Sequence, residues 1–161
     1  MRIGFGYDSH RFADGRRLVL GGVEFPGERG LAGHSDADVL VHAVIDALLG
    51  AAALGDIGEH FPDADSRWKD ADSILLLETV AREVRSAGWS VSNVDATVIC
   101  ERPKIGPFAD FMRERMASAM GIGKGRVSVK GKTNEKMDDV GAGVGIEVHA
   151  VALLEEMGAA R

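Results

Sequence analysis

A largely apolar stretch that carries three evenly spaced polar side chains constrains the fold more than any other feature. From Leu40 to Leu48, apolar residues recur at spacings of three, four, seven and eight, the pattern of one buried helix face. Asp38, His42 and Asp46 lie four residues apart, so they form a polar stripe on the same helix. Such a helix must pack its apolar face against another element, and its polar stripe must face solvent or a site.

We predict that this helix runs from about Ser35 to about Gly55. Ser35 followed by Asp38 resembles a capping box, with Asp in place of the usual Glu. Two further helices are predicted, over 73–87 and over 107–121. A glycine follows the first of these, as is common at helix C-termini, and a proline opens the second.

Segments with strand character alternate with these helices. Side chains over 2–7 alternate with period two, and 94–100 is rich in β-branched residues. The predicted strands are 2–7, 94–100, 127–130 and 145–153, with a short hairpin at 18–20 and 23–25. Interleaved strands and helices indicate an α/β or interleaved α+β fold, and the length of 161 residues suits a single domain, 1–161.

Composition excludes several classes of function. Nineteen Lys and Arg against 25 Asp and Glu give a net charge of −6, so we expect no nucleic-acid partner. One cysteine excludes an intrachain disulfide and a cysteine-cluster zinc site. We expect no secretory signal in 1–8 and no membrane span, because the longest apolar stretch, 47–54, is too short. The expected location is therefore the cytoplasm.

Two polar segments together predict a metal site. Asp8 and His10 are two apart beside the first strand, so their side chains project to one side. His42 lies mid-helix between Asp38 and Asp46, which are placed to orient its ring as outer partners of metal ligands do. Either segment alone is more often an ordinary surface or core feature. Together, one carboxylate and two imidazoles match a catalytic zinc site with an open fourth position.

Three loops deserve a chemical interpretation. The loop 55–65 is either a solvated loop with Asx turns, which its composition favours, or a binder of substrate hydroxyls. The stretch 131–136 lacks Walker A spacing, but it is a polar loop suited to a phosphate, and Glu135 can hold Mg²⁺. The proline-stiffened segment 100–107 is a candidate ligand wall, and Cys100 in it is expected to be structural rather than nucleophilic.

These segments, in this order, resemble the 2-C-methyl-D-erythritol 2,4-cyclodiphosphate synthase family of the non-mevalonate isoprenoid pathway. The resemblance covers nearly the whole chain, and its most specific block runs from His34 to Asp65. The residues that carry it are 2–4, 8–10, 32–38 with His42, 46–58, 61–65, 93–95, 102–104 and 132–136.

The resemblance implies a mixed sheet covered by helices on one face, with the sheets facing the axis of a homotrimer and active sites at the subunit interfaces. It implies Zn²⁺ held by Asp8, His10 and His42, and Mg²⁺ or Mn²⁺ held by Glu135. The implied substrate is 4-diphosphocytidyl-2-C-methyl-D-erythritol 2-phosphate. Its 2-phosphate attacks the β-phosphorus, closes a cyclic diphosphate and expels CMP, with both cations neutralising charge.

Roles for individual residues follow from the same resemblance. His34 and Thr133 are implied to stabilise the transition state. The implied substrate-binding residues are Asp8, Ser9, His10, His34, Ser35, Asp56, Ile57, Gly58, Phe61, Pro62, Asp63, Ala64, Asp65, Lys132, Thr133, Asn134 and Glu135. The implied cytidine wall is Cys100, Glu101, Arg102, Pro103, Lys104, Ile105 and Gly106.

The chain departs from the family pattern before the last strand. Many members carry an aromatic residue, an Arg and a Glu where this chain has Asp139, Ala142 and Val144. That Arg contributes to phosphate contacts and to an anion site near the trimer axis, where isoprenoid diphosphates bind. We hypothesise that Lys132 supplies part of the missing positive charge. Two alternatives remain, a zinc hydrolase of phosphate esters and a non-catalytic, metal-binding or isoprenoid-sensing trimer.

Overall fold

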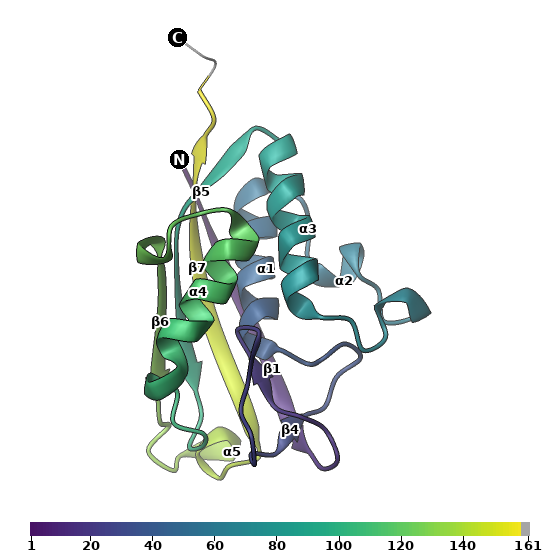
Figure 1. The fold of residues 1–161 in the computed structure, drawn as a ribbon, viewed down its shortest axis with the longest axis vertical. Coiled ribbons are helices and arrows are strands. Elements are labelled where there is room, and N and C mark those ends of the chain that lie inside the picture. The colour runs from purple at the N-terminus through teal and green to yellow at the C-terminus, as the bar shows by residue number, and fades with distance from the viewer. Residues whose placement is uncertain (159–161) are drawn as a thin grey trace.

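The computed structural model describes residues 1–158 as one five-stranded sheet with helices packed on it (Figure 1). The last three residues of the predicted domain, 159–161, lie outside the described residues. The sheet order is β4-β1-β7-β5-β6, in which only the β5–β6 pair is parallel. The strands are β1 Arg2–Ala13, β4 Gly30–Leu31, β5 Trp89–Ile99, β6 Val127–Lys132 and β7 Gly145–Glu156. A separate two-stranded ribbon pairs β2 Val19–Leu20 with β3 Val23–Glu24.

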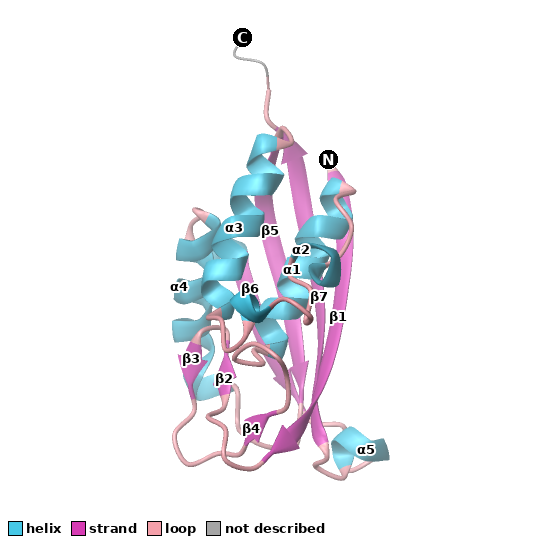
Figure 2. Ribbon diagram, turned by 90° about the vertical axis from the view of Figure 1, so that its right-hand side faces the viewer, coloured by secondary structure: helices cyan, strands magenta, loops and turns pink. Residues whose placement is uncertain are grey.

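The long helices cover one face of the sheet (Figure 2). Helix α1 crosses β1 and β7, while α4 packs near β6 and α3 lies against α1 and α4. The helices are α1 Val39–Ala52, α2 Ile57–His60, α3 Ser73–Ser86, α4 Ala109–Met120 and α5 Asp138–Gly141, with 3₁₀ turns at Ser66–Trp68, Gly106–Phe108 and Lys124–Arg126. The predicted class, a mixed α/β sheet with helices on one face, is confirmed.

Strand β1 turns its glycines, not its large apolar side chains, toward the helices. Gly4 and Gly6 are buried beneath α1, and a Cβ on either would lie 1.9 Å from a backbone oxygen of that helix. Ile3, Phe5 and Tyr7 occupy the alternate positions and point to the open face of the sheet, where they are 73%, 60% and 46% exposed. The alternation predicted for 2–7 is therefore real, and its apolar members are the exposed ones.

Helix α1 begins later than predicted. Its N-cap is Asp38, whose side chain accepts from the Val41 N–H, so the helix starts at Val39 and not near Ser35. It ends at Ala52, before the predicted Gly55, because Ala53 adopts a left-handed conformation with φ of 57°. Eleven of its 14 residues are buried, since it packs between the sheet and α3.

The other predicted elements are present with shifted ends. The hairpin at 18–20 and 23–25 and the helices over 73–87 and 107–121 are confirmed to within one or two residues. Strand β1 extends to Ala13, so Asp8 and His10 lie on the strand itself. Strand β5 starts at Trp89, five residues before the prediction, where it pairs with the end of β7. Within the described residues, no helix combines the length and the hydropathy needed to cross a bilayer.

The contact between β1 and α1 predicts a strong effect of one added methyl group. We expect Gly6→Ala to destabilise the protein by about 3 kcal/mol, because the backbone of Ala43 has to move to admit the new Cβ. Gly123→Ala is the control, since nothing lies within 4 Å of its added Cβ, and we expect a change within about 0.5 kcal/mol. Urea unfolding measures both, and equal stabilities of the two variants would contradict the packing described.

Candidate metal centre

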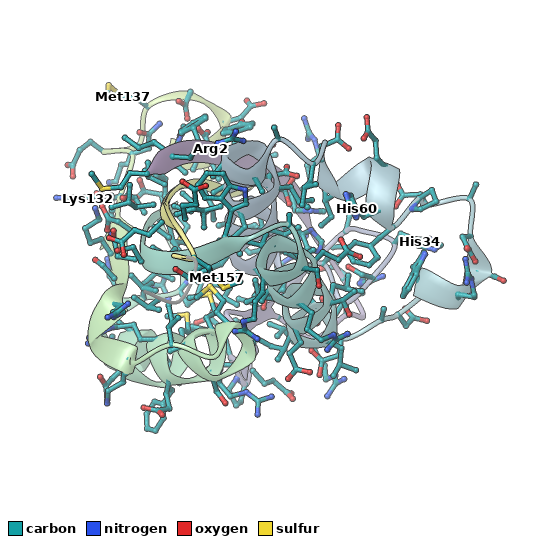
Figure 3. All side chains as sticks on the ribbon, turned by 90° about the horizontal axis from the view of Figure 1, so that it is seen from above. Arg2, His34, His60, Lys132, Met137 and Met157 are labelled. Carbon is teal, nitrogen blue, oxygen red and sulfur yellow. The ribbon has the colours of Figure 1, made fainter. Side chains whose placement is uncertain are left out.

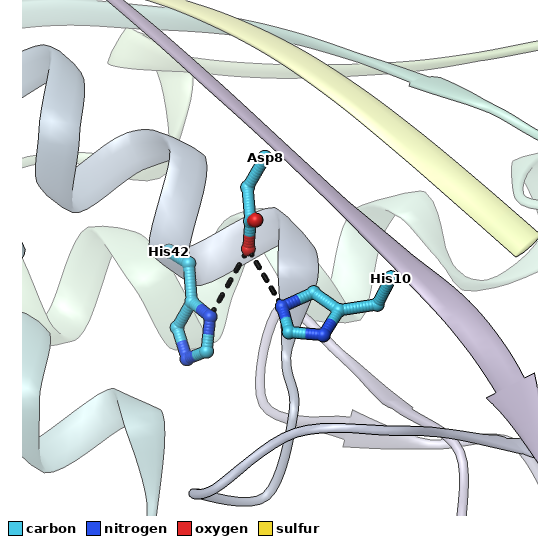
Figure 4. Close-up of side chains that lie close together, drawn as sticks. All are labelled: Asp8, His10 and His42. Atoms are coloured by element: carbon cyan, nitrogen blue, oxygen red, sulfur yellow. Dashed lines mark hydrogen bonds and ion pairs between the residues drawn. The ribbon is translucent and has the colours of Figure 1, made fainter. Parts of the chain in front are cut away.

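The packing of α1 on β1 brings Asp8, His10 and His42 together (Figure 4). Asp8 and His10 continue the helix-facing side of β1 that begins with the two glycines, and His42 projects from α1 toward them. One carboxylate oxygen, Asp8 Oδ2, lies 2.9 Å from His10 Nε2 and 3.1 Å from His42 Nδ1. The donor atoms of the three residues lie within 4.8 Å of one another. The predicted convergence of these residues is therefore confirmed.

Hydrogen bonds on the far side of each ring set its tautomer. His10 Nδ1 contacts the carbonyl oxygen of Ala32, which can only accept, so this nitrogen carries a proton. Nε2 faces Asp8 and is the nitrogen that can bind an ion once it gives up its own proton. The Ser73 hydroxyl donates to Asp36 Oδ1, so its oxygen accepts from His42 Nε2 at 3.0 Å. His42 Nδ1 faces Asp8, so each ring directs toward the same carboxylate oxygen the nitrogen that can bind an ion.

The structure corrects the role predicted for Asp38 and Asp46. The buried carboxylate of Asp38 accepts from the N–H groups of Gly21 and Gly22 and caps α1, so it holds the β2–β3 turn rather than the His42 ring. Asp46 accepts from Ile57 N at 2.8 Å and holds α2. Four-residue spacing predicted that Asp38 and Asp46 share the helix stripe of His42, but their carboxylates accept hydrogen bonds from nearby backbone N–H groups instead.

Asp36 and Ser73 are the ring partners that the sequence did not reveal. Asp36 accepts from both the backbone N–H and the hydroxyl of Ser73, the first residue of α3. Ser35 also reaches His42 Nε2, at 3.1 Å. No motif links position 73 to position 42, because their contact depends on how α3 packs against α1.

Charge in the site favours an ionised carboxylate. Burial alone would raise the pKa of Asp8, but the hydrogen bonds and charges of His10 and His42 outweigh it and hold that pKa well below its usual value. Burial would lower the pKa of His10, and its bond to Asp8 instead raises it. Burial raises the pKa of Asp38 to about 6, with the charge of Asp36 adding to the shift.

The donor set fits a divalent transition metal. A carboxylate oxygen and two imidazole nitrogens are ligands that zinc accepts, and they leave a fourth tetrahedral position for another group. The second feature of such sites, a fixed partner on the outer side of each ring, is also present here.

A second group of predicted residues gathers elsewhere. Cys100, Pro103, Lys104, Ile105 and Gly106 line a cavity of about 320 Å³ together with Gly131, Lys132 and Thr133. Cys100 is buried, its thiol contacts the Pro103 carbonyl oxygen at 3.4 Å, and burial raises its pKa to about 11. These facts agree with the predicted structural role of this cysteine.

The predicted site residues therefore form two clusters that lie apart from each other in a single chain. Lys132 lies on one side of the molecule, and His34 and His60 lie on the opposite side (Figure 3). The cavity that includes Thr133 contains none of the three triad residues. Nε2 of His34 is buried and has no hydrogen-bond partner among residues 1–158. His34 and Thr133, implied to act together, are therefore separated in a single chain.

The loop 55–65 has more internal structure than predicted. Asp56 caps α2 by accepting from Glu59 N at 3.0 Å, and Asp65 caps the turn 66–68 and pairs with Arg67. Phe61 is buried against Trp68, with ring centroids 5.0 Å apart, so its side chain packs within the loop. Pro62, Asp63 and Ala64 are exposed.

Comparisons with known proteins agree with this geometry. The sequence pattern of the YgbB family matches residues 1–155. A Moorella thermoacetica protein named 2-C-methyl-D-erythritol 2,4-cyclodiphosphate synthase is 58% identical over 154 residues, which cover 96% of this chain and 94% of that protein. The bifunctional IspDF of Campylobacter jejuni superposes with a TM-score of 0.93 and 39% identity, over 96% of this chain and 42% of that one. An IspF–CDP complex of Plasmodium falciparum superposes with a TM-score of 0.85 and 32% identity, over 98% of this chain and 97% of that one.

The fold and the triad define an α/β enzyme with a three-ligand metal-type centre. The chain belongs to the YgbB family, as the resemblance in its sequence implied. Its curated relatives are cyclodiphosphate synthases, which are cyclising lyases, and this chain is an enzyme of that class.

The hydrogen bonds that link His42 to Ser73 and Ser73 to Asp36 predict that residues which do not bind the metal still affect its affinity. We expect Ser73→Ala and Asp36→Asn each to weaken zinc binding about 10-fold or more, because the His42 ring loses its fixed tautomer and orientation. Competition with a chromophoric chelator measures the affinity. Ser86→Ala, at the exposed end of the same helix, is the matched control and should keep the affinity of the unmodified protein. Unchanged affinity in both Ser73→Ala and Asp36→Asn would contradict this role.

Proposed function

We propose that this protein converts 4-diphosphocytidyl-2-C-methyl-D-erythritol 2-phosphate to 2-C-methyl-D-erythritol 2,4-cyclodiphosphate and CMP, in non-mevalonate isoprenoid precursor synthesis. The 2-phosphate oxygen forms a bond to the β-phosphorus, and the bond from that phosphorus to the CMP oxygen breaks. The attacking phosphate is already ionised, so no general base is needed. The observation that carries the proposal is the preformed Asp8, His10 and His42 triad in a chain 58% identical to a synthase of this name.

Zn²⁺ is the ion we assign to the triad, and Mg²⁺ or Mn²⁺ to Glu135; when bound, these cations neutralise and polarise the diphosphate. The chain's own residues supply positioning, which phosphoryl transfer chiefly requires. An ion held by Asp8, His10 and His42 would leave a position for an oxygen of the diphosphate. His34 and Thr133 are assigned to stabilise the transition state, and the Thr133 hydroxyl, which donates to Glu135 in the chain alone, would turn to the substrate.

Substrate groups are assigned to the two clusters separately. Ser35 is assigned to the 2-phosphate, and Asp56, Asp63 and the backbone of Ile57 and Gly58 to the sugar alcohol. Cytosine is assigned to the cavity lined by Cys100, residues 103–107 and residues 131–133, whose volume of about 320 Å³ suits a nucleobase. Lys132 is exposed in that lining, which supports the hypothesis that it supplies positive charge in place of the Arg replaced by Ala142.

Separation of the two clusters favours a homotrimer with shared sites. A substrate that reaches from the triad to the cytosine cavity needs the triad of one copy and the 100–106 and 132–136 segments of another. The open sheet face, with exposed Ile3, Phe5, Tyr7 and Val151, offers an apolar surface for assembly around an axis. Closed rings of this kind form from head-to-tail contacts between identical subunits.

Product analysis tests the reaction. We expect the purified protein with substrate and Mg²⁺ to release CMP and a cyclic diphosphate by phosphorus NMR, and His42→Ala or zinc chelation to abolish both. An acyclic diphosphate beside CMP would contradict cyclisation and identify water as the nucleophile, as in a phosphate-ester hydrolase. No turnover with zinc bound would instead favour a binding protein.

Mixing two inactive variants tests the shared site. His42→Ala damages the triad and Glu135→Ala damages the loop, so each homotrimer should be inactive. After the two are unfolded and refolded together in equal amounts, about one quarter of interfaces should pair an intact triad with an intact loop, and activity should return to about that fraction. Activity that stays at the level of the separate variants would place both halves of the site in one subunit.

A further inference from the structure

The loop 133–138 has an unusual backbone. Glu135, Lys136 and Asp138 have φ angles of 51°, 61° and 57°, in the left-handed region that residues with a Cβ rarely adopt. Several such residues in one short segment persist only where other contacts hold them. The loop carries Thr133 and Glu135, so whatever holds it also places these two side chains.

One carboxylate from a distant part of the chain holds this loop. Glu101 Oε1 accepts from Asn134 N at 3.1 Å and from Lys136 N at 3.2 Å. Backbone N–H groups of a left-handed turn converge on a concave anion-binding surface, and here the Glu101 side chain occupies it. The side chain of Glu101 is half-buried, so part of its surface is withdrawn from water.

The other side-chain hydrogen bonds of the loop stay within residues 133–141. Asn134 Nδ2 donates to Asp138 Oδ2 at 2.6 Å, and the Thr133 hydroxyl donates to Glu135 Oε1 at 2.6 Å. Glu101, by contrast, connects the loop to the segment 100–106, of which Cys100 and residues 103–106 line the cavity with Lys132 and Thr133. A backbone bond from Cys100 N to Lys132 O, 2.9 Å long, joins the two segments just before it.

We propose that Glu101 is a positioning residue for Thr133 and Glu135, and that it makes the nucleobase wall and the metal-binding loop a single unit. The proposal rests on the proposed function, in which Glu135 holds the second cation. Glu101 was implied to belong to the cytidine wall. The structure instead directs its carboxylate to the backbone of the loop, so its effect on the reaction passes through other residues.

Two substitutions of Glu101 distinguish a positioning role from a direct effect of its negative charge. Both hydrogen bonds end on the same oxygen, so the amide oxygen of Glu101→Gln can accept both while the negative charge is lost. Glu101→Ala removes the acceptor and leaves two N–H groups without their partner. A positioning role therefore predicts that Gln restores what Ala loses, whereas a metal ligand or a charge effect predicts that both variants fail.

Amide hydrogen exchange tests the contact itself. In Glu101→Ala we expect the Asn134 and Lys136 amides to exchange about tenfold faster, and in Glu101→Gln we expect them to stay protected. Glu28→Ala is the matched control, because Glu28 and Glu101 both line a second surface cavity, of about 440 Å³, and Glu28 makes no hydrogen bond to residues 133–138 in the described part of the chain. Unchanged exchange in Glu101→Ala would overturn the proposal.

Mn²⁺ titration in the presence of CDP tests the consequence. We expect Glu101→Ala to raise the Mn²⁺ concentration for half-saturation about tenfold with unchanged zinc content, and Glu101→Gln to match the unmodified protein. Equal loss in both variants would overturn the positioning role. Absence of cyclising turnover in the unmodified protein would defeat the proposed function alone, because the exchange measurement on Glu101 does not depend on activity.

Discussion

The close approach of α1 to β1 is the contact on which the rest of the structure depends. Two glycines on the inner side of the strand let the helix backbone come within reach, and no residue with a side chain fits at either position. The next inward position on the same strand is Asp8, and the helix face pressed against the strand presents His42. The packing that forms the core therefore also sets the distances within the triad.

Hydrogen bonds around the triad complete what packing begins. A backbone carbonyl fixes the His10 ring, and the chain from Asp36 through Ser73 fixes the His42 ring. Both rings thus direct a possible ligand nitrogen toward Asp8 before any ion arrives. Ligands held in this way lose little freedom on metal binding, and this supports the assignment of the triad as a metal centre rather than an ordinary polar cluster.

The sequence was sufficient for the triad because its spacing rules are local. Period two on a strand places Asp8 with His10, and His42 was chosen as a polar position inside a largely apolar helix. The same kind of rule failed for Asp38 and Asp46, because spacing gives the face of a helix but not which backbone donors lie nearby. Gly21 and Gly22, which bind Asp38, reach it through tertiary packing alone.

Residues that act through long-range contacts escaped prediction for the same reason. Ser73 contacts His42 only because α3 packs on α1. Glu101 contacts Asn134 only because β5 and β6 are parallel strands, so the segments that follow them leave the sheet at the same end. The start of α1 was misplaced because Ser35 and Asp38 are both good caps, and the choice between them depended on the buried turn that Asp38 also holds. Propensity ranks such candidates but does not decide between them.

We propose that zinc binds in the triad and that a second copy of the chain completes the site. Anomalous diffraction at the zinc edge, on crystals grown with zinc and CDP, tests both parts of this proposal together. We expect one strong peak about 2.0–2.2 Å from an Asp8 oxygen and from the nitrogens of His10 and His42 that face it, with the 132–136 loop of a neighbouring copy nearby. Zinc bound only at other residues, or a triad that faces no second copy, would contradict it.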